Sequence, residues 1–144
     1  MKIYPILVIS SLLVAFTAGV SEEVLVKMLE QIRSACHPKF PDLPEEVLDK
    51  LRMGFEPEFA SNSLKCYGKC VLQYLGVLTK KGDINKGKAT AKLLLILPDE
   101  LHPLGVAGVD KCIGVQNDYK DSCDKVWYFS ICVKHFDERL FNSP

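Results

Sequence analysis

The stretch LKCYGKC, residues Leu64–Cys70, places two cysteines four positions apart in a segment with helical periodicity. A helix turns by about 100° per residue, so Cys66 and Cys70 lie on nearly the same side of it, with parallel Cα–Cβ bonds. A disulfide requires the two Cβ atoms to approach one another. Each of these cysteines is therefore expected to pair with a different neighbouring segment, which would tie one helix to two others.

The N-terminus predicts export. Met1 and Lys2 are followed by the apolar run ILVISSLLVAF and by the small residues of TAG. The run is too short for a membrane-spanning helix, which needs about 20 apolar residues. Residues 1–19 are interpreted as a signal peptide, with an uncleaved anchor as the alternative. Residues 20–144 then have the size of one domain. This domain is expected in extracellular fluid, without stable insertion into a membrane.

The cysteine content favours disulfides over a metal site. An even number of cysteines in an exported chain is typical of a disulfide framework. Zinc sites prefer CxxC pairs or nearby histidines, whereas His37, His102 and His135 are scattered, so no metal is expected. Cys123 and Cys132 are nine residues apart, point to opposite sides of a helix and are also expected to have different partners. The intervals of 29, 3, 41, 10 and 8 residues separate Cys36, Cys66, Cys70, Cys112, Cys123 and Cys132.

The charged residues are balanced and dispersed, with 18 basic and 18 acidic side chains. Nucleic acid is therefore not an expected partner, because binding it requires a basic face. A small secreted disulfide-rich hydrolase is the alternative from another functional class. Neither GxSxG nor an Asp-rich calcium loop occurs, and HFDE at residues 135–138 is the nearest arrangement. No catalytic residue and no cofactor are predicted.

Hydrophobic periodicity predicts an all-α fold of six short helices without strands. Ser21 and Asn85 are expected to cap the first and fourth helices, and Asp42 or Leu43 the second. The third helix is expected to run from residues 61–63 to about Thr79. The remaining segments are a second helix over PDLPEEVLDKLR, a fourth that stops before Pro98, a fifth within residues 99–118 and a sixth from about Asp121.

The cysteine intervals, the signal peptide and the six helices together resemble the insect odorant-binding and pheromone-binding protein family. The stretches IRSACHPKF, LDKLRMG and CYGKCVLQYLGVLTKKGDIN add to the resemblance, which covers all of residues 20–144. It implies six helices around a hydrophobic cavity and pairing of the first cysteine with the third, the second with the fifth and the fourth with the sixth. In this sequence those pairs are Cys36–Cys70, Cys66–Cys123 and Cys112–Cys132.

The resemblance implies a secreted carrier. Such a protein would hold a small hydrophobic ligand, such as an odorant, a pheromone or a lipid-like molecule, and transport it through sensillar lymph or another extracellular fluid. An odorant receptor and a second copy of the chain are the further expected partners. The alternative is a carrier of the same fold in a non-olfactory secretion, because the sequence does not state the tissue.

The expected ligand-binding residues are apolar side chains of irregular shape on helix faces. Ordinary core packing is the alternative for each of them. The hydroxyl groups of Tyr67, Tyr74 and Tyr128 are candidates for orienting a ligand oxygen. The expected cavity wall consists of Met53, Phe55, Leu72, Leu75, Ile84, Leu94, Ile96, Ile113, Trp127, Phe129, Val133 and Phe141.

The tail VKHFDERLFNSP after Cys132 leads to two hypotheses. In relatives with such tails the last residues cover the pocket, which here would involve Val133, Phe136, Leu140 and Phe141; a frayed end is the alternative. The second hypothesis concerns pH. Protonation of His135 or His102 at acid pH would loosen the pocket, with a surface histidine of no special role as the alternative.

Overall fold

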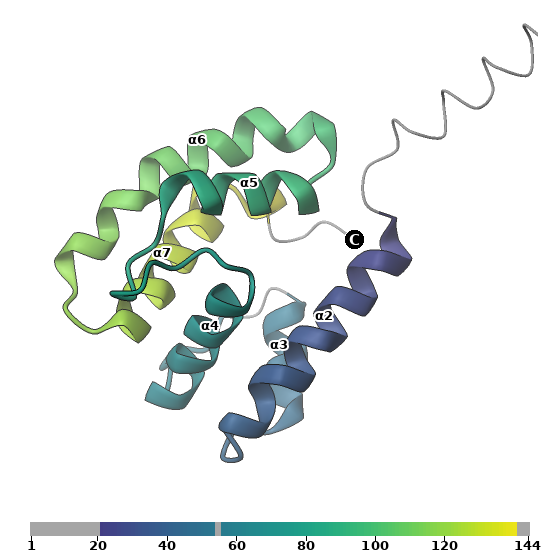
Figure 1. Ribbon diagram of the computed structural model, residues 1–144, viewed down its shortest axis with the longest axis vertical. Helices are drawn as coiled ribbons and strands as arrows, with labels where there is room; N and C mark the ends of the chain where they lie inside the picture. The colour runs from purple at the N-terminus through teal and green to yellow at the C-terminus, as the bar shows by residue number, and fades with distance from the viewer. Residues whose placement is uncertain (1–20, 54–55, 141–144) are drawn as a thin grey trace, which may run out of the picture.

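A computed structural model describes residues 21–53 and 56–140, and within these ranges the fold is all-α, as predicted (Figure 1). None of the described helices is long and apolar enough to cross a bilayer. The predicted signal peptide, residues 1–19, lies outside the described residues. The described residues form six α-helices, which are α2 (Glu22–Cys36), α3 (Glu45–Arg52), α4 (Asn62–Tyr74), α5 (Lys86–Ile96), α6 (His102–Cys112) and α7 (Ser122–Phe136).

Side-chain caps begin four of these helices. In each case a side-chain oxygen accepts a hydrogen bond from a backbone N–H of the first turn, which has no partner inside the helix. The predicted caps at Ser21 and Asn85 are confirmed. The distances are 3.4 Å from Ser21 Oγ to Val24 N, 3.2 Å from Ser61 Oγ to Leu64 N, 3.0 Å from Asn85 Oδ1 to Lys88 N and 2.8 Å from Asp121 Oδ1 to Cys123 N.

The start of α3 differs from the prediction. Its N-cap is Pro44, in an extended conformation and without a side-chain cap, so the expected cap at Asp42 or Leu43 is wrong. Leu43 has another role, because its side chain is buried and its carbonyl oxygen lies 2.8 Å from His37 Nε2. The chain therefore makes a tight connection between η1 (His37–Lys39) and α3 before the helix begins.

The end of α4 also differs, because the helix stops at Tyr74 and not near Thr79. Gly76 adopts a φ of 73°, a left-handed conformation that favours glycine. Its N–H donates to Gln73 O and the N–H of Val77 donates to Leu72 O, which together form a Schellman motif. The reversal buries Val77, so the apolar residues after Gly76 serve the core without extending the helix.

Three disulfides connect four helices, with the pairing that the family resemblance implied. The α4 helix is bonded to both α2 and α7, and α7 is bonded to both α4 and α6, so each of these two helices has two different partners as expected. The helices α3 and α5 carry no cysteine. The bonds and their Cα–Cα distances are Cys36–Cys70 at 5.8 Å, Cys66–Cys123 at 4.6 Å and Cys112–Cys132 at 5.7 Å.

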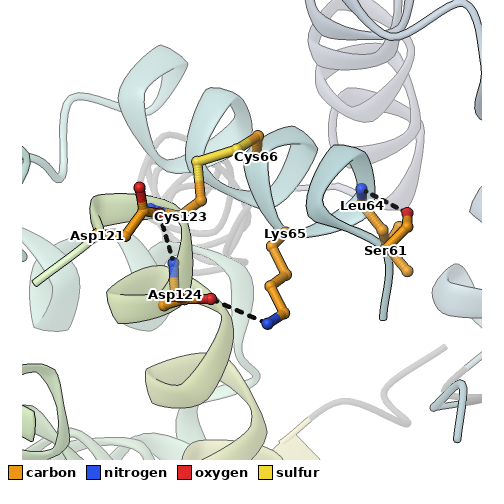
Figure 2. Close-up of polar contacts among 7 residues, drawn as sticks. All are labelled: Ser61, Leu64, Lys65, Cys66, Asp121, Cys123 and Asp124. Carbon is orange, nitrogen blue, oxygen red and sulfur yellow. Dashed lines mark hydrogen bonds and ion pairs between the residues drawn. A yellow bond between two sulfur atoms is a disulfide. The ribbon is translucent and has the colours of Figure 1, made fainter. Parts of the chain in front are cut away.

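The contact between α4 and α7 combines a disulfide with an ion pair, as Figure 2 shows. Lys65 Nζ lies 2.9 Å from Asp124 Oδ1, next to the Cys66–Cys123 bond. The hydrogen bond to the Asp124 carboxylate raises the pKa of the Lys65 ammonium group. Covalent and polar contacts thus hold the N-terminal halves of the two central helices together.

The buried apolar residues form two clusters. The larger cluster joins α5, α6 and α7 and includes Val77, Val109 and Val126, each at most 2% exposed. The smaller cluster is centred on Leu43, Leu48 and Leu64 and connects α3 with α4. Trp127 and Tyr67 pack against the smaller cluster. The space between the two clusters is where the core is incomplete.

Candidate functional site

A cavity of about 340 Å³ lies between the two clusters and is partly open to solvent. Its volume falls in the range of small-molecule pockets. Residues of both clusters contribute, so an occupant would contact both parts of the core. The lining residues are Leu51, Leu64, Tyr67, Gly68, Val71, Leu72, Leu75, Val77, Ala89, Lys92, Leu93, Ile96, Val109, Val126, Trp127, Phe129, Ser130 and Val133.

The helix α4 supplies one wall through regular spacing. Leu64, Gly68, Val71 and Leu75 follow one another at intervals of four, three and four residues, which places them on one face. A Cβ atom at Gly68 would lie 3.7 Å from Val126 Cγ1, which is an ordinary contact distance, so α7 packs against this part of α4. The wall is therefore shaped by the same face that packs on α7.

The cavity has a closed end and an open side. Val77, Val109 and Val126 form the closed end and are almost fully buried. Leu51 of α3 and Ile96 of α5 are only half-buried, while Lys92 of α5 is exposed. Within the described residues, the one exposed lining residue therefore lies on α5, whereas half-buried lining residues come from α3 and α5 and also from α4 and α7.

Half of the predicted wall residues line this cavity. They come from α4 and the residue that follows it, from α5 and from α7, and Phe129 and Val133 are buried. Phe55 and Phe141 lie outside the described residues, and four other predicted residues lie elsewhere in the fold. The six that line the cavity are Leu72, Leu75, Ile96, Trp127, Phe129 and Val133.

Four predicted wall residues lie away from the cavity, each for a different physical reason. Met53 follows the end of α3 and is 64% exposed. Ile84 is buried in the larger cluster, and its N–H donates to Gln116 Oε1 at 2.8 Å. Ile113 comes after the end of α6 and packs against the larger cluster outside the cavity wall. Leu94 is one position away from Leu93, which lines the cavity in its place.

Few polar groups reach the wall. Ser130 Oγ donates a hydrogen bond to Val126 O at 2.8 Å, so the hydroxyl is already paired within α7. Tyr67 is half-buried, and this burial raises the pKa of its phenol. The other two candidate tyrosines are not among the lining residues, because Tyr74 is half-exposed and Tyr128 stacks on Tyr119 at 4.3 Å. The wall is thus almost entirely apolar.

The wall residues that sequence reasoning missed include apolar residues, some of them on α4, and small or polar residues. Those on α4 share the spacing of the predicted Leu72 and Leu75, so the same periodicity would have found them. Ala89, Lys92 and Ser130 have no such signal, since small or polar residues on a cavity wall look like surface residues in the sequence. The missed apolar residues are Leu51, Leu64, Val71, Val77, Leu93, Val109 and Val126, together with Gly68.

A comparison with known families shows the family of this chain. Residues 19–135 match the sequence model of the PBP/GOBP family, the insect pheromone-binding and general odorant-binding proteins. The chain belongs to this family. Members are odorant-binding carrier proteins rather than enzymes, and they are secreted. Within the described residues no group of histidine, cysteine, aspartate and glutamate side chains could hold a metal ion.

Named relatives of this PBP/GOBP chain agree with that assignment. General odorant-binding protein 72 of Anopheles gambiae is 30% identical over 106 residues, which cover 74% of this chain and 84% of the relative. General odorant-binding protein 19a of Drosophila melanogaster is 29% identical over 122 residues, which cover 82% of this chain and 80% of the relative.

Solved structures show the same fold. Apis mellifera odorant binding protein 5 superposes with a TM-score of 0.68 at 22% identity and covers 88% of this chain and 100% of its own. Odorant binding protein 4 of Chrysopa pallens has a TM-score of 0.68 at 18% identity and covers 87% of this chain and 99% of its own. The helical arrangement of the PBP/GOBP family is thus present over most of the chain.

The tail of this PBP/GOBP chain packs against α6 in its described part. Leu140 is buried, and a Cβ atom at Gly108 would lie 3.2 Å from both Leu140 Cδ1 and Phe136 Cδ1. Neither Leu140 nor Phe136 lines the cavity. The tail up to residue 140 therefore packs against α6, while Phe141 lies outside the described residues.

The histidines lie away from the cavity wall. His135 Nε2 is 2.8 Å from Glu56 Oε2, and His102 Nε2 is 3.0 Å from Leu97 O. His135 and His102 are therefore held by contacts outside the cavity wall, and neither lines the cavity. The pH hypothesis stays a prediction.

Proposed function

We propose that this chain is a secreted carrier that binds a small hydrophobic ligand in the cavity and transports it through aqueous extracellular fluid. In this proposal residues 1–19 are a signal peptide and residues 20–144 form the carrier domain. The observation that carries the proposal is an apolar cavity of about 340 Å³ inside a helical frame with three disulfides. Family membership supports the same reading.

The chemistry of the wall selects an apolar ligand. Transfer of a methylene group from water to an apolar site is favourable by about 0.8 kcal/mol. An alkyl chain with about ten buried methylenes would gain about 8 kcal/mol, before the loss of translational and rotational freedom on binding is subtracted. A short polar ligand would gain little, because the Ser130 hydroxyl is already bonded to Val126 O.

The setting in which the carrier works is proposed in two forms. The first form, which family membership supports, is delivery to an odorant receptor through sensillar lymph, and a second copy of the chain is a further proposed partner. A carrier in another secretion is the alternative. The solved fatty acid binding protein OBP56a from the oral disk of the blowfly Phormia regina has the same fold, with a TM-score of 0.56 at 20% identity.

Displacement of a fluorescent apolar probe tests the carrier function. The protein is titrated with N-phenyl-1-naphthylamine, and alcohols, esters, aldehydes and fatty acids then compete with the bound probe. Trp127 is the only tryptophan and lines the cavity, so its emission should change in parallel with binding. Saturable binding with one site supports the proposal, whereas no saturable binding of the probe or of any ligand class contradicts it.

Expression in insect cells tests the export proposal separately. The N-terminal sequence of protein collected from the medium should begin near residue 20. Retention of the full chain in the cells would contradict secretion but would leave the proposal of ligand binding in the cavity unaffected.

A further inference from the structure

We propose that Lys92 binds the carboxylate of an amphiphilic ligand at the mouth of the cavity, so that the favoured ligand is a long-chain fatty acid. This inference rests on the proposed carrier function and specifies the ligand class. The cavity would hold the alkyl chain, and the ammonium group of Lys92 would lie near the charged end.

The position of Lys92 on α5 places it at the boundary between the cavity and solvent. Ala89, Lys92, Leu93 and Ile96 line the cavity and are spaced by three, one and three residues, so they share one helix face. Ala89 is buried and Ile96 is half-buried, whereas Lys92 is exposed. The aliphatic part of a lysine can lie along an apolar wall while its ammonium group stays in water.

Lys92 is the only formally charged residue of the wall, and within the described residues its ammonium group makes no ion pair or hydrogen bond. Its helix has the sequence KGKATAKLLLI, with three lysines and no acidic residue. Lys86 is paired with Asp110 at 2.7 Å. The mouth of the cavity therefore has an excess of positive charge on the α5 side.

A carboxylate matches this arrangement better than other head groups do. At the mouth it can remain partly hydrated, so the large cost of burying a charge is avoided. A partly exposed ion pair contributes modestly, on the order of fivefold in affinity. Phosphate groups are usually bound by several donors at once, and a single lysine suits a monoanion.

The test compares ligands that share one alkyl chain and differ in the head group. Dissociation constants of dodecanoic acid, dodecan-1-ol and methyl dodecanoate are measured by probe displacement at pH 7.4 for the unmodified protein and for Lys92→Met. The unmodified protein is expected to prefer the acid over the alcohol about fivefold. Lys92→Met should remove this preference and leave the affinity for the alcohol unchanged.

Two variants on the same helix serve as controls. Lys92→Arg keeps the charge and should keep the preference for the acid. Lys88→Met removes a lysine that does not line the cavity and should change neither affinity. Raising the salt concentration should reduce the preference in the unmodified protein, because salt screens exposed charges.

The outcomes separate this inference from the carrier function. If the unmodified protein binds the alcohol as tightly as the acid, or if Lys92→Met weakens both ligands equally, the role of Lys92 is overturned and the carrier stands. If neither the acid, the alcohol nor the ester binds, both the carrier function and the inference are overturned.

Discussion

The helices that carry cysteines and the helices that do not occupy different places around the cavity. The bonded helices α2, α4, α6 and α7 form a continuous frame, and α6 and α7 supply its buried end through Val109 and Val126. The unbonded helices α3 and α5 contribute Leu51, Lys92 and Ile96 to the more accessible part of the wall, next to half-buried residues of α4 and α7. The covalent bonds thus stabilise the buried end of the cavity, and weaker contacts hold the two unbonded helices at its more accessible part.

Noncovalent contacts hold each of the unbonded helices. Arg33 Nη1 donates to Asp49 Oδ1 at 2.7 Å and Arg33 Nη2 donates to Glu45 O at 3.2 Å, which ties α3 to α2. Gly105 lets α6 approach α5 closely, since a Cβ atom there would lie 2.7 Å from Leu97 Cδ1. Elements held in this way open locally at lower free energy than the core, which suits the border of a ligand entrance.

The disulfides also offset the cost of the cavity. An unfilled apolar space of about 340 Å³ would lower the free energy of unfolding by about 8 kcal/mol. Three disulfides at about 3 to 4 kcal/mol each are enough to compensate. The frame can therefore remain folded with the site empty, as a carrier that loads and unloads requires.

The largest effect is expected from removing the bond between the two central helices. Cys66→Ser combined with Cys123→Ser opens a loop of 57 residues and should lower the free energy of unfolding by about 4 kcal/mol. Urea denaturation measures it. A loss below about 1 kcal/mol would mean that the frame does not depend on this bond, and the comparison between bonded and unbonded helices would fail.

A smaller effect is expected from shortening side chains at the two ends of the cavity. Val126→Ala removes buried methyl groups and should cost about 2 kcal/mol of unfolding free energy. Leu51→Ala removes a half-buried side chain at the opening and should cost less than about 1 kcal/mol. Equal losses in urea denaturation would contradict the distinction between a closed end and an open side.

Removal of the contact between α2 and α3 should loosen α3 without unfolding the frame. Arg33→Met deletes two hydrogen bonds, worth about 1 kcal/mol together, and should speed hydrogen exchange of α3 amides about fivefold. Exchange in α4 should not change. Lys50→Met, which removes only an exposed ion pair with Glu46, is the control and should leave α3 exchange unchanged. Faster exchange in α4 as well would show that α3 does not open independently.

The smallest effect is expected from the ion pair beside the Cys66–Cys123 bond. A double-mutant cycle with Lys65→Met and Asp124→Asn should give a coupling of about 0.5 to 1 kcal/mol at neutral pH. The pKa of Lys65 is raised in the folded state by its hydrogen bond to Asp124, so this stability is present below the unfolded pKa. It should disappear as the pH rises through the folded pKa. A coupling that grows with pH would contradict this assignment.

The disulfide pairing was predictable from the sequence because the cysteine intervals resemble those of a known family, which implied the three pairs. Helix geometry alone indicated only that Cys66 and Cys70 bond to different segments. The caps at Ser21 and Asn85 were predictable because capping depends on residues close together in the sequence. The end of α4 was missed because apolar residues continue past Gly76, whose left-handed conformation reverses the chain. A periodic pattern does not report such a reversal.

The cavity wall was only partly predictable because its residues depend on how helices meet. On α5 the run of three leucines, Leu93 to Leu95, leaves the buried face undetermined, and the structure places Leu93 on the wall while Leu95 is 58% exposed. Lys92 has no sequence signal, since an exposed lysine on a helix is ordinary. Lys92 is related to a ligand only by the position of its side chain on the cavity wall, which the sequence does not report.

Ligand binding by a variant with a filled cavity tests the central claim most directly. Ala89→Phe places an aromatic ring in the cavity from α5, whereas Ala91→Phe adds the same ring on the same helix at an exposed position outside the wall. Ala89→Phe is expected to weaken N-phenyl-1-naphthylamine binding at least tenfold while the protein remains folded, and Ala91→Phe should bind like the unmodified protein. Unchanged binding by a folded Ala89→Phe variant would show that the ligand does not occupy this cavity.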